Sequence, residues 1–363
     1  MKLRKTCAWI LSLAMTFSLA ACGSSNGGDS GNSSGNNSGN NSDTPDKVYT
    51  LTVSMHDGSQ TLKGRYMQEW ADNLREETNG ALDISVIAGG ALASADTVVE
   101  AMETGACDIA MVYTTYYDAL FTLTNGVALP MLGIGSAQQA TEVMWDMYEQ
   151  SPEMKAEFDN YIPIHVYSNG PSYFHFVKNP VNTFDGISGL KLRSGGGSMT
   201  DFITACGGAP MNITTSELYE ALEKGLVDGN VCNGSQMSSW NLAEVESYFM
   251  DMPLFVGVWM TLMNKDSFEK LPAELQQAIM NSGGREGSLK LATYLQDEND
   301  AGYEAAIANN DGQWISVAEE EQAKFAAAAD AYNHSWIENH TTADFDAQNY
   351  YDMLMASAAQ HAE

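Results

Sequence analysis

The stretch ALDISVIAGGALASADTVVEAMETGACDIAMV, residues 81–112, indicates the fold class of this chain. Residues 81–90 are rich in β-branched and apolar side chains and predict a strand, residues 95–105 have the apolar spacing of a helix, and residues 107–112 predict a second, buried strand. Strands that alternate with helices pair in parallel through right-handed crossovers. The stretch therefore predicts an α/β fold.

The same alternation extends to both sides of this stretch. Residues 48–55 predict a strand and residues 61–80 a helix that closes at Asn79-Gly80. Beyond residue 170, strands are predicted at 172–179, 190–193, 209–213 and 226–232, and helices at 198–208 and 216–225. Residues 266–282 begin a further helix with an interruption at Gly283-Gly284, and the rest of the chain is mostly helical.

We expect this pattern to form two lobes. Residues 47–170 with about 257–295 would make lobe 1, and residues 171–256 with about 296–363 would make lobe 2 and the C-terminal helices. Clefts between such lobes are the usual sites for small molecules.

The first 46 residues have the pattern of an exported lipoprotein. A basic start is followed by an apolar run of about 15 residues, which is typical of a secretory signal and too short to span a bilayer stably. The sequence LAAC at 19–22 is similar to a bacterial lipobox, so we expect cleavage after residue 21 and lipidation of Cys22; an ordinary signal peptide is the alternative. Residues 22–46, nearly all Gly, Ser, Asn and Asp, predict a flexible tether. The expected location is extracytoplasmic, anchored by lipid to the cell membrane.

The charge balance narrows the classes of partner. The chain has 17 basic and 47 acidic residues, a formal charge of −30. Nucleic-acid binding is excluded, because no basic surface is available to neutralise phosphates. We expect Cys107 and Cys206 to be buried as small apolar side chains. The formation of one disulfide bond is the alternative.

One arginine stands out in this acidic background. The sequence GLKLRSGGGS, residues 189–198, places Arg193 at the end of a short strand, followed by Gly195, Gly196 and Gly197. A guanidinium presents two parallel N–H groups to a carboxylate. The glycines would let backbone N–H groups and the next helix N-terminus approach the same anion. The alternative is an ordinary salt bridge to one of the many acidic residues.

Three segments together resemble a known family. Residues 76–112, residues 169–193 and the sequence SELYEALEKGLVDGN at 216–230 are similar, in order and spacing, to the solute-binding proteins of tripartite ATP-independent periplasmic (TRAP) transporters, the DctP-like family. The resemblance covers about 48–340. It implies a two-lobed receptor with a long helix spanning both lobes, and delivery of the ligand to an ion-coupled permease with a small and a large membrane subunit. It also implies that Arg193 binds a substrate carboxylate.

The chain departs from the family pattern at several places. No second arginine follows Gly170, Thr215 replaces an aromatic residue, and Cys232 stands where an asparagine often contacts ligand, with Asn233 one residue later. A second desolvated carboxylate on the ligand would then lack a cationic partner, at a cost of several kcal/mol (order of magnitude). We therefore expect a small organic acid with one carboxylate.

Several other residues are candidates for the cleft because they follow strands. The full set of predicted ligand-binding residues is Arg193, Tyr173, Gly195, Thr215, Cys232, Asn233, Trp240, Asp96 and Thr114, and Asp57 is a further candidate. For the residues chosen only because they follow strands, ordinary packing is the alternative.

Two other functions stay open at this point. A solute receptor of an ATP-driven importer would share the lipid anchor and the two lobes. An extracellular hydrolase would need a catalytic motif, and downstream of the tether the sequence contains no G-x-S-x-G, HExxH or Walker A pattern and no paired Cys/His spacing. We expect no cofactor, no metal and no catalysis.

Overall fold

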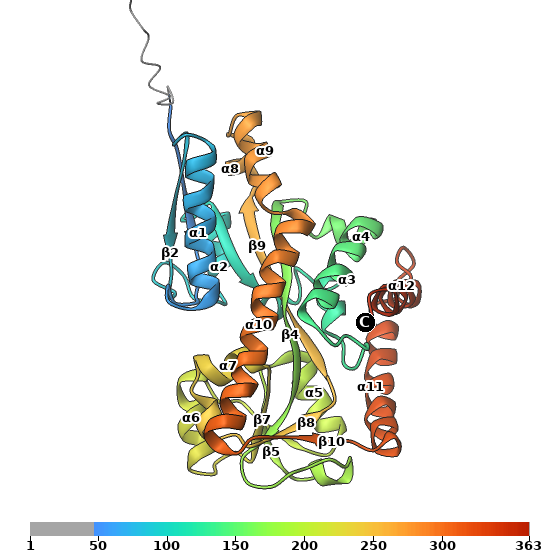
Figure 1. Ribbon diagram of the computed structural model, residues 1–363. Helices are drawn as coiled ribbons and strands as arrows, with labels where there is room; N and C mark the ends of the chain where they lie inside the picture. The colour runs from blue at the N-terminus through green and yellow to red at the C-terminus, as the bar shows by residue number, and fades with distance from the viewer. Residues whose placement is uncertain (1–46, 363) are drawn as a thin grey trace, which may run out of the picture. The chain divides into compact units, whose positions relative to one another are not determined.

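The computed structural model describes residues 47–362, and in this part of the chain ten strands form one sheet (Figure 1). Along its main path the strands are β2 (Leu82–Ile87), β1 (Tyr49–Ser54), β3 (Ile109–Tyr113), β9 (Phe255–Asn264), β4 (Tyr161–Phe176), β7 (Gly229–Cys232), β5 (Lys191–Arg193) and β6 (Ala209–Met211). The strands β8 (Tyr248–Asp251) and β10 (Gln313–Ser316) branch off beside β4. The predicted signal sequence, the lipidation of Cys22 and the tether lie outside the described residues.

The pairing within the sheet confirms the α/β prediction. β1 pairs in parallel with β2 and β3, and β5 pairs in parallel with β6 and β7. These two parallel groups are joined by the long strands β4 and β9, which run antiparallel to each other and to their outer neighbours. The carboxyl ends of the parallel strands are the places where ligands usually bind in such folds.

Helices cover both groups of strands. They are α1 (Leu62–Glu77), α2 (Val98–Glu103), α3 (Ala137–Gln150), α4 (Pro152–Ala156), α5 (Gly197–Ala205), α6 (Thr215–Glu223), α7 (Gly234–Ser239), α8 (Lys265–Glu269), α9 (Ala273–Ser282), α10 (Gly284–Asn310), α11 (Glu319–His340) and α12 (Ala347–Gln360). Local signals explain their ends: the Thr61 hydroxyl caps α1 by accepting a hydrogen bond from the Gly64 N–H at 3.1 Å, and Asn79 and Gly80 follow α1 with positive φ. No helix in residues 47–362 combines the length and the apolar character needed to cross a membrane.

The sheet and helices enclose separate apolar cores in the two halves. The parallel strands β1–β3 pack beneath α1, α9 and α10, and a second cluster on the other side includes α3 and α12. In the other half, one cluster includes Phe325 and Ala329 of α11, and another includes Leu218 of α6 and Tyr303 of α10. Cys107, Cys206 and Cys232 are buried and free, so the described residues contain no disulfide.

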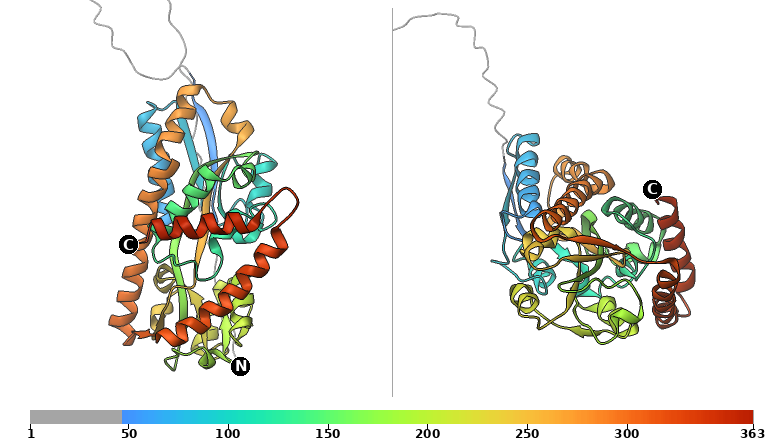
Figure 2. Two further views of the ribbon diagram at one scale, coloured as in Figure 1. Left: turned by 90° about the vertical axis from the view of Figure 1, so that its right-hand side faces the viewer. Right: turned by 60° about the horizontal axis from the view of Figure 1, so that its bottom comes forward.

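Two features bear on how the chain divides into lobes. The expected boundary near residue 170 falls inside β4, at a break in register between Ser168 and Pro171 where Gly170 has φ +90°. α12 packs on α3, which lies in the range expected for lobe 1, whereas α11 packs on α5 (Figure 2). We propose that the lobes divide at this point of β4, with α12 belonging to lobe 1.

The long helix α10 runs beside β4 and reaches α7 (Figure 1). It is separated from α9 at Gly283, where a Cβ would collide with the carbonyl oxygen of Ile164. Further along, a Cβ at Gly302 would collide with the carbonyl oxygen of Gly234. Glycine is therefore required at both positions because two backbones meet.

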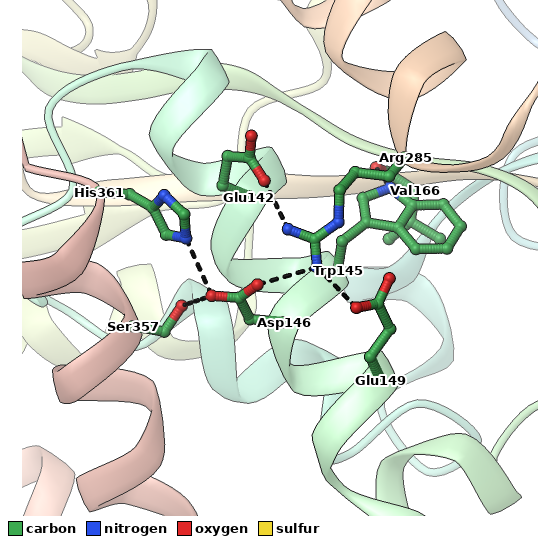
Figure 3. Close-up of polar contacts among 8 residues, drawn as sticks. All are labelled: Glu142, Trp145, Asp146, Glu149, Val166, Arg285, Ser357 and His361. Atoms are coloured by element: carbon green, nitrogen blue, oxygen red, sulfur yellow. Dashed lines mark hydrogen bonds and ion pairs between the residues drawn. The ribbon is translucent and has the colours of Figure 1, made fainter.

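The first turn of α10 is tied to α3 and α12 by a charged network (Figure 3). Arg285 donates to Glu142 at 2.6 Å, to Asp146 at 2.8 Å and to Glu149 at 3.0 Å. The second oxygen of Asp146 accepts from the Ser357 hydroxyl at 2.8 Å and lies 2.9 Å from His361 Nε2. Burial opposes ionisation of Asp146, but these hydrogen bonds outweigh it and lower its pKa.

We predict that Asp146→Ala lowers the free energy of unfolding by about 3 kcal/mol, because it leaves a part-buried guanidinium without its most buried partner. Glu149→Ala is the control: the Glu149 side chain is 55% exposed, and its loss should cost at most about 1 kcal/mol. Urea unfolding at pH 7 measures both. Equal losses of unfolding free energy in the two variants would contradict the conclusion that Asp146 is the more important partner of Arg285.

The same network predicts an acid dependence. Since the folded pKa of Asp146 is lowered, its contribution to stability is complete above the unfolded value of about 4 and is lost as the pH falls through the lower folded value. The stability difference between the natural protein and Asp146→Ala should therefore shrink below about pH 4. If the difference in unfolding free energy between the two proteins stayed constant down to pH 2, the predicted lowering of the Asp146 pKa would be wrong.

Candidate functional site

A cavity of about 430 Å³ lies where both halves of the sheet contribute residues. From one half it is lined by the loop after β1, the start of α1 and the end of β3; from the other it is lined by the end of β5, the start of α6 and α7. β4, β9 and α10 contribute residues between them. The position at the carboxyl ends of parallel strands is the one expected for a small-molecule site.

Arg193 lines this cavity at the end of β5. Its Nε donates to the Ile213 carbonyl at 3.3 Å, and its guanidinium carbon lies 5.4 Å from the centre of the Trp240 ring. Burial lowers the pKa of Arg193 from its ordinary value. No carboxylate among residues 47–362 lies within ion-pair distance of it, so its remaining N–H groups are available to an anion.

The glycines after Arg193 serve the turn into α5. Gly196 and Gly197 have φ +99° and +54°, where a side chain would be strained. Gly195 lines the cavity, but its N–H points to the Met199 sulfur at 3.2 Å. Gly197, which begins α5, lies outside the cavity lining. Met199, in the first turn of α5, does line the cavity, so an approach of this helix N-terminus to an anion stays a prediction.

Aromatic side chains form the wall of the cavity to which β3, β9 and the loop after β1 contribute. Trp259 of β9 stacks on Tyr113 at 4.6 Å and on His56 at 5.3 Å between ring centres. Lys63 Nζ lies 3.2 Å from the centre of the Trp259 ring. Both Lys63 and Trp259 are largely buried, so this wall is held rigidly by ring stacking and a cation–π contact.

The ionisable groups on this wall differ in how they are paired. Lys63 Nζ lies 3.4 Å from Asp57 Oδ1; burial lowers the pKa of Lys63, and Asp57 opposes the shift. Burial also lowers the pKa of His56. Glu298 of α10 has neither a hydrogen bond nor an ion pair among the described residues, and burial raises its pKa while Lys63 and Arg65 oppose the shift.

The structure brings together five of the nine predicted ligand-binding residues. The lining includes Arg193, Gly195, Thr215, Asn233 and Trp240, and also Asp57. Tyr173, Cys232, Asp96 and Thr114 lie outside it, although a residue next to each of them is part of the lining.

For Tyr173 and Cys232 the reason is the alternation of side chains along a strand. The two residues are direct partners across β4 and β7, and they face away from the cavity while Ser172 and Asn233 line it. Tyr173 packs edge-on to Trp314 at 5.0 Å, and the Cys232 sulfur lies 3.2 Å from His175 Nδ1. The shift of one residue turns each side chain to the other face.

Asp96 and Thr114 also miss the lining by one residue, although neither lies on a strand. Asp96 is exposed and accepts a hydrogen bond from the Ser94 hydroxyl, while its neighbour Ala95 lines the cavity. Thr114 is buried and donates to the Val258 carbonyl at 3.2 Å, while its neighbour Tyr113 lines the cavity.

Sequence reasoning missed several lining residues. The cavity lining also includes Lys63, Asn169, Trp259 and Glu298. Lys63 lies within the predicted helix 61–80 and Glu298 within the mostly helical remainder, whereas Asn169 and Trp259 stand outside the predicted elements. Tyr113 follows the predicted strand 107–112 directly, so its position after a strand was a usable signal.

Two groups of described residues have the spacing of metal ligands, and both lie outside the cavity lining. In one, His175 Nδ1 lies 2.8 Å from Glu246 and 3.2 Å from Cys232, all fully buried. The other comprises Glu142, Asp146 and His361, where Arg285 already supplies a positive charge. Each is accounted for as a hydrogen-bonded network of the fold.

Comparison with known proteins identifies a protein family whose profile matches most of this chain. The profile described as bacterial extracellular solute-binding protein, family 7 (DctP), matches residues 53–339. An uncharacterised protein of Sinorhizobium fredii is 28% identical over 181 residues, 50% of this chain and 33% of that protein. A solute-binding protein of Chromohalobacter salexigens is 23% identical over 217 residues, 60% of this chain and 64% of that protein. The chain thus spans less than two thirds of either relative.

Solved structures share the fold. A TRAP solute-binding protein from Rhodoferax ferrireducens, in complex with copurified benzoate, superposes with a TM-score of 0.78 at 21% identity and covers 87% of this chain and 99% of its own. Likeness at this level of identity establishes the two-lobed fold.

We predict that the pKa of Lys63, which burial lowers, lies below that of the exposed Lys224, whose pKa is raised by its hydrogen bond to Glu220. NMR of protein with ¹³C-labelled lysine, assigned with Lys63→Met, measures both. Asp57→Asn should lower the pKa of Lys63 further, because the carboxylate favours the charged amine. A rise in the Lys63 pKa in Asp57→Asn would contradict the geometry.

Proposed function

The chain belongs to the bacterial extracellular solute-binding proteins of family 7, and on that premise we propose that it captures a small monocarboxylate in the cavity around Arg193. The observation that carries the proposal is a part-buried guanidinium that lines the cavity with no carboxylate of the described chain within ion-pair distance. In a chain with 47 acidic residues, such a group is suited to an anion that arrives from outside.

The remaining charges of the lining favour one carboxylate over two. Lys63, the other cation on the wall, is already paired with Asp57. A second carboxylate on the ligand would be desolvated without a partner, at a cost of several kcal/mol (order of magnitude). The aromatic side chains of Tyr113, Trp240 and Trp259 suit an apolar or ring-bearing remainder.

Capture would couple to closure of the two lobes. A ligand held by Arg193 on one side and by the aromatic wall on the other contacts both lobes, and it shifts an open–closed equilibrium by its higher affinity for the closed form. The strands β4 and β9 join the two halves, and the register break of β4 near Gly170 is a suitable place for bending.

The partners follow from the family. Its members are extracellular receptors, and we propose that this one is lipidated at Cys22 and delivers its ligand to an ion-coupled TRAP permease with a small and a large membrane subunit. The solved relatives described as TRAP solute-binding proteins support this choice. Neighbouring genes for one short and one long membrane protein would agree with it, whereas a neighbouring ATPase gene would favour an ATP-driven importer.

We predict that Arg193→Ala weakens binding of monocarboxylates by at least about 30-fold, the low end of the roughly 2–5 kcal/mol lost when one partner of a buried charge pair is removed. Arg193→Lys should keep the charge but lose the two-pronged geometry and most of the affinity. Thermal-shift screening of small organic acids, followed by calorimetry, measures both.

Arg75→Ala is the matched control, because Arg75 is 56% exposed and pairs with Asp83 away from the cavity. The Arg75→Ala variant should bind monocarboxylates with the same affinity as the natural protein. The proposal is wrong if Arg193→Ala binds acids normally, or if diacids such as succinate bind in clear preference to monoacids.

A further inference from the structure

The ionisable side chains that line the cavity include two unpaired charges of opposite sign. Lys63 and Asp57 are paired with each other, and His56, whose pKa burial lowers, stacks on Trp259. Arg193 and Glu298 remain, and neither has an ion-pair partner among residues 47–362. They are not paired with each other either, so the two groups stand apart in the lining.

Glu298 is presented to the cavity by a rigid part of α10. The next residue, Asn299, accepts a hydrogen bond from the Ser235 N–H at 2.7 Å and donates to the Asn169 carbonyl. One turn later Gly302 lies against Gly234 of α7. Because α10 is fixed to β4 and α7 directly after this point, the backbone of Glu298 has little freedom to carry the side chain out of the cavity.

A desolvated carboxylate without a donor is costly, and its cost grows when a closing cleft excludes water. A donor on the ligand would offset that cost, whereas a second carboxylate on the ligand would be repelled. We propose that the bound monocarboxylate carries, away from its carboxyl group, a hydrogen-bond donor such as a hydroxyl or an amine, which Glu298 accepts. This inference rests on the proposed function, because it takes Arg193 as the site of the ligand carboxylate.

The test compares acids that differ only in the donor. The full-length protein, purified in detergent, is titrated calorimetrically with benzoate, 3-hydroxybenzoate and benzene-1,3-dicarboxylate, and with butanoate and 3-hydroxybutanoate. The hydroxylated member of each pair should bind at least about 10-fold more tightly than its parent, as expected for a hydrogen bond to a charged group. The dicarboxylate should bind more weakly than benzoate.

Three variants assign the effect to Glu298. Glu298→Leu should remove the preference for the hydroxylated acids and let the parent acids bind more tightly than they bind the natural protein, because the carboxylate whose desolvation is costly is gone. Glu298→Gln keeps an acceptor oxygen, so it should retain a reduced preference and bind the dicarboxylate better than the natural protein does. Glu304→Gln, on an exposed position of the same helix outside the lining, should change nothing.

The outcomes separate this inference from the function it rests on. Equal affinities within each pair, or a preference that survives in Glu298→Leu, would overturn the inference while Arg193-dependent binding stood. Binding of these acids that is unaffected by Arg193→Ala, or failure of every probe to bind, would overturn both.

Discussion

The close crossing of α10 with α7 and β4 is the constraint on which the rest of the structure depends. At Gly302 and Gly234 the two backbones approach so closely that neither position has room for a Cβ directed at the other chain segment. Asn299 fills the adjacent space with hydrogen bonds to Ser235 and Asn169. One helix therefore sets the relative position of a strand that runs through both halves and a helix that borders the cavity.

That crossing determines what the cavity contains. Because α10 passes along the cavity, it contributes Glu298, and because α7 is fixed against it, Asn233 and Trp240 are placed on the side of Arg193. Arg285, at the other end of the same helix, is surrounded by three acidic groups. The two arginines have opposite surroundings: Arg285 is neutralised and structural, whereas Arg193 is left to an external anion.

The residues that sequence reasoning placed correctly are those whose position follows from a motif. Arg193 and Thr215 stand at the ends of short, recognisable segments, and both line the cavity. Tyr173 and Cys232 miss the cavity by one residue. In the strands β4 and β7 both faces are buried, so the alternation of polar and apolar residues that would reveal the orientation of each side chain is absent.

By itself, the sequence determined the α/β class, the approximate order of strands and helices, and the arginine at the end of β5, because periodicity, capping residues and Gly-rich turns are local properties. Only the tertiary structure decided that β4 continues through the expected lobe boundary, that Lys63 is paired with Asp57, and that Glu298 enters the cavity unpaired. The course of β4 and the position of Glu298 depend on contacts between segments far apart in the sequence. The Lys63–Asp57 pair joins residues only six positions apart, but it depends on how the loop after β1 folds against the start of α1. Local composition reveals none of these.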